Sequence, residues 1–538
     1  MRRADREPAS IRLHPDMAET DNESKRPGPD VPDRMSALVS NAAAIRTVAA
    51  AVEGTLGPKG LNCMLVDRFG DVTVTNDGST ILDKIDVTHP AARMLVGTAK
   101  AQDREVGDGT TTATILASAL VTEGVSQVAK GVPVTKVIEG MRSGLDCGIA
   151  AMESRSRRIT GFDDPLLMQA AIIAGRGEQE IAALAVQAAA LVGPATLAEP
   201  GFQLRDWIVA RQGARSEVFP GIIIEKERLN RQMPRVVRRA RVLLVDDALE
   251  PEEIEEEALA TEAGFARYLE LKRRFAEALK GVLALGINIV VVERSVSDDA
   301  EAALTEAGVM ALRRVSSRDM ARIAEHTGAR PLKRTGLQRS PDEIEPCIGR
   351  ARLVAEDERL GHVRFEGGKG RRVATMLIGA STAEVREERQ RIAEDATSAV
   401  QQALLGGVLP GGGAAEIAAS SEVQRLRESI PGMAAYGADC VAEALKRPLA
   451  QIVANAGFNP LEKLGNLMAE RARDQEHALA IDCDTGAVVD MLGLGVVDPT
   501  TVKVHALRAA GEVAEAVLRI NTIIRKRDPA QRPPDVGA

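Results

Sequence analysis

The sequence predicts a multidomain protein in which an α/β domain is inserted into a mainly α-helical chain. The chain has 538 residues, several times what one hydrophobic core supports, so about two to four domains are expected. Apolar residues recur at helical spacing in the first and last thirds, whereas the middle third holds short β-branched runs between helical patterns. Strands that alternate with helices in this way are typical of an α/β domain.

The first third predicts helices and one hairpin. Residues 35–54 carry apolar side chains at helical spacing and predict a helix. Residues 63–67 and 71–75 alternate in character around a short turn and predict a β-hairpin. A loop at residues 107–112 then opens a helix that runs roughly to Glu123, and helices rich in alanine follow.

The middle third predicts strands between helices. An acidic run at residues 250–257 leads into a long helical pattern that ends near Leu285. From Thr382 the helical character returns, with interruptions at residues 410–413 and 490–499. The runs that predict strands are residues 221–225, 241–246 and 287–293.

Composition and charge argue against several classes of protein. Lys and Arg total 69 against 77 for Asp and Glu, a formal net charge of −8, which argues against a general binder of nucleic acid or anionic membranes. The cysteines form no CxxC pair, so neither disulfides nor a zinc site are expected, and a cytoplasmic location fits. No apolar run is long enough to predict a membrane span. Residues 1–34 and 528–538 predict a disordered leader and a disordered tail.

Two glycine-rich loops have the features that a bound triphosphate requires. In residues 54–60 the glycines let backbone N–H groups approach phosphate oxygens, and Lys59 adds a positive charge. In residues 107–112 the threonines stand at a helix N-terminus, which favours an anion, and Asp108 is a hard oxygen ligand suited to Mg²⁺. Neither loop matches a Walker A or Rossmann pattern, and tight turns and threonine caps also explain them without a ligand.

Four further signals each have an ordinary structural explanation. Asp77 precedes a glycine and predicts an Asp-Gly turn. Asp395 lies on the buried stripe of a helix, where an aspartate is usually solvated or paired. Asp498 precedes a proline and predicts a helix N-cap. Residues 410–413 predict a flexible connector, so none of the four signals alone predicts a ligand.

Several segments follow one another in a set order: GTLGPKG, TNDGSTIL, VGDGTTTAT, EDA, LPGGGAAE, NAGFNPLEKL and VVDMLGLGVVDPTTVK. Over roughly residues 34–527 they resemble the chaperonin family, and more closely its group II branch of thermosomes and cytosolic chaperonins, which has bacterial relatives. The resemblance implies a chaperonin fold with three domains. These are a mainly α-helical equatorial ATPase domain (residues 35–150 and 410–527), an α/β intermediate hinge domain (151–214 and 370–409) and an α/β apical domain (215–369) with a helical-protrusion lid at about residues 250–285.

The resemblance also implies where ATP and Mg²⁺ bind. Asp395 and Asp77 would be the catalytic carboxylates, which meet near the γ-phosphate when the subunit closes, and Asp108 would bind Mg²⁺. Gly412 would pack against the nucleoside, and Asp498 would hydrogen-bond the ribose. The phosphates would be contacted by Thr55, Leu56, Gly57, Pro58, Gly109, Thr110, Thr111 and Thr112, and the adenine would lie near Ile481 and Asp482.

One position departs from the group II pattern. Arg176 stands where group II members usually carry a lysine that senses the γ-phosphate. Arginine keeps the positive charge but presents a planar fork in place of a compact ammonium. Phosphate sensing by Arg176 is expected, and a surface arginine without a role is the alternative.

The function that the resemblance implies is an ATP-driven folding chamber. Identical subunits would form two stacked rings, and eight subunits per ring are expected. The rings would capture non-native proteins and close over them without a co-chaperonin. For the acidic run at residues 250–257 the alternative is a solvated helix face, and the protrusion is shorter than in typical archaeal members. Two other functions compete. A scaffold that binds nucleotide without folding proteins is mildly favoured by Arg176 and the short lid, but the presence of Asp77, Asp108 and Asp395 argues strongly against it. A small-molecule phosphotransferase finds no supporting cluster among the six histidines.

Overall fold

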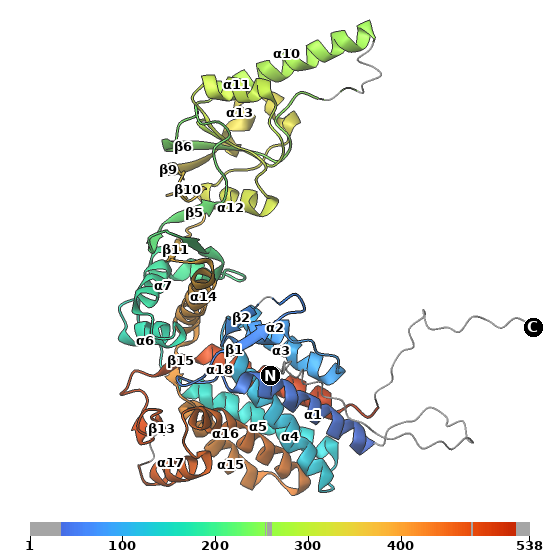
Figure 1. Cartoon of the computed structure of the whole chain (residues 1–538), viewed down its shortest axis with the longest axis vertical. Coiled ribbons are helices and arrows are strands. Elements are labelled where there is room, and N and C mark those ends of the chain that lie inside the picture. The colour runs from blue at the N-terminus through green and yellow to red at the C-terminus, as the bar shows by residue number, and fades with distance from the viewer. Residues whose placement is uncertain (1–33, 71, 253, 255–260, 475–476, 523–538) are drawn as a thin grey trace, which may run out of the picture.

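The computed structural model describes residues 34–70, 72–252, 254, 261–474 and 477–522. These residues form three regions that follow one another along the longest axis of the molecule: a helical body, a middle region and an α/β region (Figure 1). The predicted disordered tail lies outside the described residues. So does the predicted leader, apart from Arg34, where the first helix begins.

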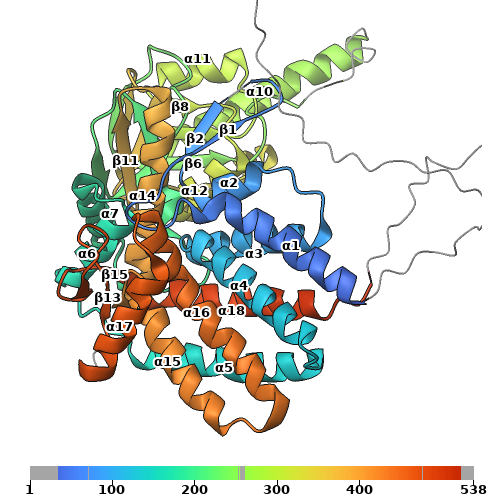
Figure 2. The same cartoon turned by 60° about the horizontal axis from the view of Figure 1, so that its bottom comes forward.

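The helical body is built from both ends of the described chain. Its helices are α1 (Arg34–Glu53), α2 (Gly78–Lys84), α3 (Pro90–Val106), α4 (Thr110–Ala129), α5 (Val134–Ser154), α15 (Ala414–Ser429), η4 (Gly432–Ala434), α16 (Ala435–Asn455), α17 (Pro460–Asp474) and α18 (Thr500–Leu518). Helix α4 packs against α1, α3, α16 and α18, and most of its residues are therefore buried (Figure 2). Segments far apart in sequence thus share one core.

The helix predicted from the loop of residues 107–112 is confirmed and begins at Thr110, but its predicted end near Glu123 is wrong. Helix α4 continues to Ala129. Gly124 lies inside the helix, and a Cβ there would approach Cδ1 of Leu518 to 2.7 Å. The glycine that marks a helix end in the sequence is therefore a point of close packing against α18.

Helix α1 is apolar enough to resemble a membrane span, but it packs on the helical body. By length and composition alone, Met35–Glu53 would be able to cross a membrane, a test that core helices also pass. Leu38, Ile45 and Val52 are fully buried, and the helix contacts α3 and α4. Its apolar residues are thus accounted for by the core of the body.

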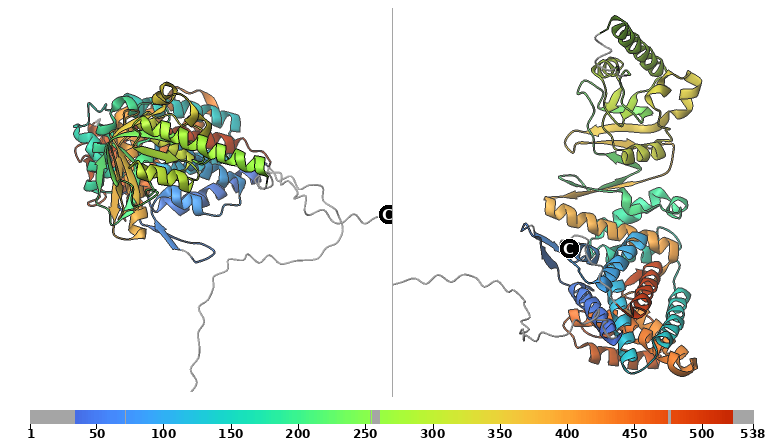
Figure 3. Two further views of the ribbon diagram at one scale, coloured as in Figure 1. Left: turned by 90° about the horizontal axis from the view of Figure 1, so that it is seen from above. Right: turned by 90° about the vertical axis from the view of Figure 1, so that its right-hand side faces the viewer.

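The predicted β-hairpin is confirmed. Strands β1 (Cys63–Val66) and β2 (Val72–Thr75) pair antiparallel, with Cys63 opposite Thr75 and Val66 opposite Val72. The hairpin stands away from the helices of the body (Figure 3).

The α/β region contains a mixed six-stranded sheet in the order β5-β10-β9-β6-β7-β8. Its strands are β5 (Gly221–Ile224), β6 (Val236–Val245), β7 (Ile289–Val292), β8 (Met310–Leu312), β9 (Gly349–Asp357) and β10 (His362–Glu366). Strands β6, β7 and β8 are parallel and the other pairs are antiparallel. The helices are α10 (Glu262–Ala284), α11 (Asp298–Glu306), α12 (Ser317–Thr327), η2 (Arg334–Gln338), α13 (Pro341–Ile344) and η3 (Glu345–Cys347).

All three strands predicted from β-branched runs are present. The continuous run in β7 is buried on both faces, which explains why it does not alternate with polar residues. Strand β6 begins at Val236, before the predicted start at Arg241. Its first half contains Arg238 and Arg239, whose charge hides the strand signal, and it pairs there with β9.

Helix α10 is the described part of the predicted lid. Its buried residues, Phe275, Leu279 and Val282, all lie in its second half. In the first half Phe265 and Leu269 are 54% and 51% exposed, and this half projects from the sheet (Figure 1). The residues of the acidic run at positions 253 and 255–257 lie outside the described residues.

The middle region connects the body to the α/β region. Its helices are α6 (Pro165–Ala174), α7 (Gln179–Val192), α8 (Pro194–Leu197), η1 (Leu204–Trp207) and α14 (Ala383–Gly406), beside a three-stranded sheet of β3 (Ile208–Gln212), β11 (Thr375–Ala380) and β4 (Glu217–Phe219). Two short pairs complete the fold: β12 (Val408–Pro410) with β15 (Val497–Pro499), and β13 (Leu479–Ile481) with β14 (Val488–Asp490). The domain boundaries expected from the sequence remain predictions.

Candidate functional site

The loops that carry Asp77 and Asp108 touch each other at the surface of the body. A Cβ on Gly78 would lie 2.4 Å from Oγ1 of Thr111, so only glycine fits between the two loops. Gly107 and Gly109 have φ values of 72° and 78°, in the left-handed region that favours glycine. They allow the tight turn that places Asp108 between α3 and α4.

Asp77 is the N-cap of α2, not the residue of an Asp-Gly turn. Its Oδ2 accepts hydrogen bonds from the Thr80 hydroxyl at 2.6 Å, the Thr80 backbone N–H at 2.9 Å and the Ser79 hydroxyl at 2.9 Å. Burial raises the pKa of Asp77, but these hydrogen bonds outweigh it and lower the pKa below its ordinary value. The carboxylate is therefore ionised and held in one orientation.

The pKa of Asp108 is raised, whereas that of Asp77 is lowered. Burial raises its pKa to about 6, with a further contribution from the charges of Asp498 and Asp77, although the backbone N–H of Gly109 donates to its Oδ1 at 2.6 Å. The amide of Gln102, which is completely buried, donates to the Asp108 carbonyl at 2.8 Å and to the Val502 carbonyl at 3.2 Å. Gln102 thus ties this loop to α18.

Asp395 comes to the site on α14. A Cβ on Gly107 would lie 2.3 Å from Oγ of Ser398, so α14 packs directly on the Asp108 loop. Burial and the neighbouring carboxylates of Asp108 and Asp77 raise the pKa of Asp395 well above its ordinary value, and Arg176 opposes this shift. Two carboxyl groups whose pKa values are shifted in opposite directions therefore face the same space.

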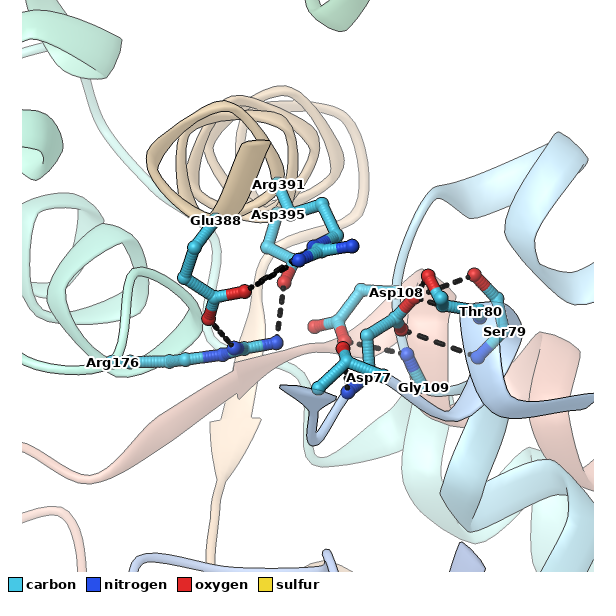
Figure 4. Close-up of polar contacts among 10 residues, drawn as sticks. Asp77, Ser79, Thr80, Asp108, Gly109, Arg176, Glu388, Arg391 and Asp395 are labelled. Atoms are coloured by element: carbon cyan, nitrogen blue, oxygen red, sulfur yellow. Dashed lines mark hydrogen bonds and ion pairs between the residues drawn. The ribbon is translucent and has the colours of Figure 1, made fainter. Parts of the chain in front are cut away.

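Arg176 forms ion pairs with two residues of α14, and phosphate sensing by Arg176 stays a prediction. It follows α6 with a φ of 54°, unusual for a residue with a side chain. Its Nη1 lies 2.6 Å from Oε1 of Glu388, and its Nη2 lies 3.5 Å from Oδ2 of Asp395. Figure 4 shows Arg176 and Asp395 on one side of the site, with Asp77 and Asp108 on the other.

A cavity of about 280 Å³ lies between the body and α14. Asp77 and Asp395 both line it, although they come from α2 and α14. The other charged residues that line it are Asp103, Arg205, Asp206, Arg391 and Glu394. The structure thus brings together the two carboxylates that were expected to act together.

Residues 55–58 lie outside this cavity, in a loop held against the end of α16. The amide of Asn455 donates to the carbonyls of Glu53 and Leu56, both at 2.8 Å. Gly57 has a φ of 86° and contacts Ile452, while the Thr55 hydroxyl donates to the Val52 carbonyl at 2.8 Å. Sequence reasoning missed this contact of Asn455 with the loop expected to bind phosphate, although Asn455 begins the quoted segment NAGFNPLEKL.

Lys59, in the loop of residues 54–60, is paired with an acidic residue. Its Nζ lies 2.6 Å from Oδ1 of Asp484. Asp482, in the same turn, accepts hydrogen bonds from the Thr485 hydroxyl and the Asp484 N–H. Ile481 is buried with Met491. Because Lys59 pairs with Asp484, the segment expected near adenine is linked to the loop of residues 54–60.

Asp498 is not the N-cap that the sequence suggests. It lies in β15, Pro499 takes the cap position of α18 without a side-chain hydrogen bond, and Oδ2 of Asp498 lies 2.8 Å from Nζ of Lys503. A Cβ on Gly412 would lie 3.3 Å from the sulfur of Met491. Residues 410–413 therefore do not form a flexible connector: they pass through a strand pair and a packed turn.

The donor set of the site suits a phosphate-bound cation better than a closed metal site. Among the described residues, no group of three or more His, Cys, Asp or Glu side chains is placed to hold a metal. Mg²⁺ in proteins commonly takes one or two carboxylates and completes its shell with phosphates and water. Asp108 is suited to such a role, and α4 begins beside it with no side-chain cap hydrogen bond at Gly109.

Comparison with known proteins gives consistent matches over nearly the whole chain. Residues 48–528 match the TCP-1/cpn60 chaperonin family. A thermosome subunit of Pyrococcus abyssi is 33% identical over 501 residues, covering 90% of both chains. A thermosome subunit beta of Archaeoglobus fulgidus is 36% identical over 504 residues, covering 90% of this chain and 91% of its own. The crystal structure of a group III chaperonin in the open state matches with a TM-score of 0.84 and 46% identity, over 91% of this chain and 99% of that one.

Proposed function

Because this chain belongs to the TCP-1/cpn60 chaperonin family and is an ATP-dependent chaperonin subunit, we propose that it hydrolyses ATP at the cavity between the body and α14. The observation that carries this proposal is that Asp77 and Asp395, from separate regions of the chain, line one cavity. A site shared between two regions makes hydrolysis depend on how they sit together. That dependence couples the chemistry to closure of the subunit.

The phosphates would bind at the two glycine-rich loops. The N–H groups of Thr110, Thr111 and Thr112 begin α4, and no side chain caps them, which leaves an anion site at the helix N-terminus. Residues 55–58 would contact the phosphates from the other loop, and Arg176 would sense the γ-phosphate. We assign the ribose to Asp498, the nucleoside face to Gly412 and the adenine to the surroundings of Ile481 and Asp482.

Asp108 would hold Mg²⁺ at the phosphates. Its pKa of about 6 leaves the carboxylate ionised at neutral pH, as a hard-cation ligand must be. When bound, Mg²⁺ offsets the negative charge that develops on the phosphates. The fit rests on the donor set: one carboxylate beside an uncapped helix N-terminus.

Asp77 and Asp395 would orient the attacking water. Asp77 is ionised and fixed by the hydroxyls and N–H groups of Ser79 and Thr80, so it is a preorganised acceptor. Asp395, with its raised pKa, is closer to the range in which a carboxyl group exchanges a proton at neutral pH. The two environments separate the pKa values of the pair, as in sites where two carboxyl groups have different tasks.

The assembly would be a double ring that encloses non-native proteins. We propose identical subunits, eight in each ring, in the cytoplasm. Sixteen subunits of 57.2 kDa give a particle of about 915 kDa. The exposed first half of α10 would belong to the built-in lid, so no co-chaperonin is needed.

The proposed site is tested with Asp395→Ala. The variant should bind ATP with unchanged affinity and hydrolyse it at least about a hundredfold more slowly, because it loses a group that orients the water. Asp439→Ala is the matched control, since Asp439 pairs with Arg427 on the far helices of the body and should leave hydrolysis unchanged. Wild-type turnover by Asp395→Ala would contradict the proposal.

A further inference from the structure

A buried ion pair lies beside Asp498. Nζ of Lys503 is 2.7 Å from Oε1 of Glu416 and 2.8 Å from Oδ2 of Asp498. The side chains of Lys503 and Glu416 are 7% and 2% exposed, against 31% for Asp498. Because desolvation offsets most of the attraction within a buried ion pair, stability alone does not explain this arrangement.

The backbone places these three residues at a junction of two helices. Strands β12 and β15 pair with Leu409 opposite Asp498, and the N–H of Gly411 donates to the Val496 carbonyl at 2.8 Å. Helices α15 and α18 begin just after these strands and carry Glu416 and Lys503 in their first turns. A Cβ on Gly411 would lie 3.2 Å from Oδ2 of Asp498, so the carboxylate lies against the glycine run.

Lys503 is too deeply buried to bind a ligand itself. Burial lowers its pKa, but the charges and hydrogen bonds of Asp498 and Glu416 outweigh this and raise the pKa above its ordinary value, so the ammonium stays charged. In the described part of the chain, Lys503 is the hydrogen-bond partner of the Asp498 side chain, and it takes Oδ2. This leaves Oδ1 of the partly exposed Asp498 for a ligand.

We propose that Lys503 is a positioning residue for ribose recognition. Its ammonium holds one oxygen of Asp498 and turns the other toward the ribose hydroxyls of the nucleotide, while Glu416 fixes the ammonium from the opposite side. This inference rests on the proposed role of Asp498. Lys503 would thus help to discriminate between nucleotides that have ribose hydroxyls and nucleotides that lack them. It would do so through Asp498, without touching the nucleotide.

The test compares ATP with 2′,3′-dideoxy-ATP, which lacks both hydroxyls. Lys503→Met alone would strand the buried carboxylate of Glu416, whose Oε2 has no partner among the described residues. The pair Lys503→Met with Glu416→Gln removes both charges and keeps the side-chain volumes. We expect its dissociation constant for ATP to rise about tenfold, the loss of one charged hydrogen bond, and that for the dideoxy nucleotide to stay unchanged.

The matched control is Lys446→Met with Glu443→Gln, an ion pair on α16 with the same chemistry. It should keep the wild-type ratio of the two dissociation constants. The proposal is overturned if the Lys503 and Glu416 pair variant also keeps that ratio, whether its two dissociation constants stay unchanged or rise by the same factor. A rise by the same factor indicates a structural role only. Asp498→Ala distinguishes the role of Asp498 from that of Lys503. If this variant also keeps the wild-type ratio, the ribose role of Asp498 fails. If only Asp498→Ala changes the ratio, the role of Lys503 alone is refuted.

Discussion

The guanidinium of Arg176 lies beside the carboxylate of Asp395, with 3.5 Å between Nη2 and Oδ2. The same guanidinium holds Glu388 at 2.6 Å through Nη1. Its planar fork thus spans two acidic residues of α14, a geometry that the single ammonium of a lysine does not reproduce. The departure from the group II pattern at this position therefore links the expected phosphate sensor directly to the expected catalytic carboxylate.

Arg176→Ala should move the acid limb of the pH–rate profile to higher pH. Arg176 lowers the pKa of Asp395, so its removal raises that pKa further, and more of the carboxyl group is protonated at a given pH. The turnover number, measured as a function of pH at saturating ATP, shows the shift. Arg389→Ala is the control, because Arg389 lies on α14, the helix that carries Asp395, but pairs with Glu180. An identical profile for Arg176→Ala and wild type would contradict the link.

Asp108→Asn should stabilise the nucleotide-free subunit more strongly at about pH 8 than at about pH 5. The pKa of Asp108 is about 6 in the folded chain, above its ordinary value of 3.8. The folded state therefore binds this proton more tightly, and that contribution is present below the ordinary pKa and is lost as the pH rises through 6. The neutral amide removes the cost of the buried charge, and Tm should rise by roughly 2–5 °C at the higher pH.

Added nucleotide should have the opposite effect and favour the wild type over Asp108→Asn. With ATP and Mg²⁺ added, the Tm of the wild type should rise and that of Asp108→Asn should rise less, because the variant lacks the anionic ligand. Thermal unfolding at both pH values, with and without ATP and Mg²⁺, measures all four cases. A variant that is stabilised by ATP and Mg²⁺ as strongly as wild type would refute the assignment of Asp108 to the metal.

Asn455→Ala should weaken ATP binding and leave the turnover number nearly unchanged. Two carbonyls of the loop, those of Glu53 and Leu56, lose their donor, so the loop of residues 55–58 is no longer fixed. The loss of about one to two hydrogen bonds corresponds to roughly a tenfold rise in the dissociation constant. Asn459→Ala is the control: Asn459 also makes two hydrogen bonds, to the backbone of Leu461 and Glu462, without touching the loop. Equal effects of the two variants would contradict a specific role for Asn455.

The sequence predicts elements and motif residues well because both depend on local pattern. The hairpin, the buried strand β7 and the helix after the loop of residues 107–112 all follow from periodicity, whereas the end of α4 and the start of β6 depend on packing partners. The residues missed at the site are Gln102, Asn455 and Lys503. Asn455 and Lys503 lie within quoted segments, but each of the three contacts a segment some 80 to 400 positions away in the sequence, and the local pattern does not reveal these contacts.

The role of Asp77 shows the same limit in reverse. From the sequence alone, an aspartate before a glycine predicts a turn. The structure makes it an N-cap whose hydrogen bonds keep the carboxylate ionised beside the cavity, so the structural and the proposed catalytic roles coexist. The ordinary explanation and the functional one need not exclude each other.

Removing the projecting half of α10 should open the chamber without stopping hydrolysis. Replacing residues 253–271 with a short glycine-serine linker keeps Phe275, Leu279 and Val282, which anchor the rest of the helix in the α/β region. Because this half of α10 lies at one end of the molecule, away from α2 and α14, which carry the carboxylates of the cavity, ATP turnover should stay close to wild type (Figure 1). A client protein bound in the presence of ATP should become accessible to protease in the variant. Complete protection of the client would show that another segment closes the chamber.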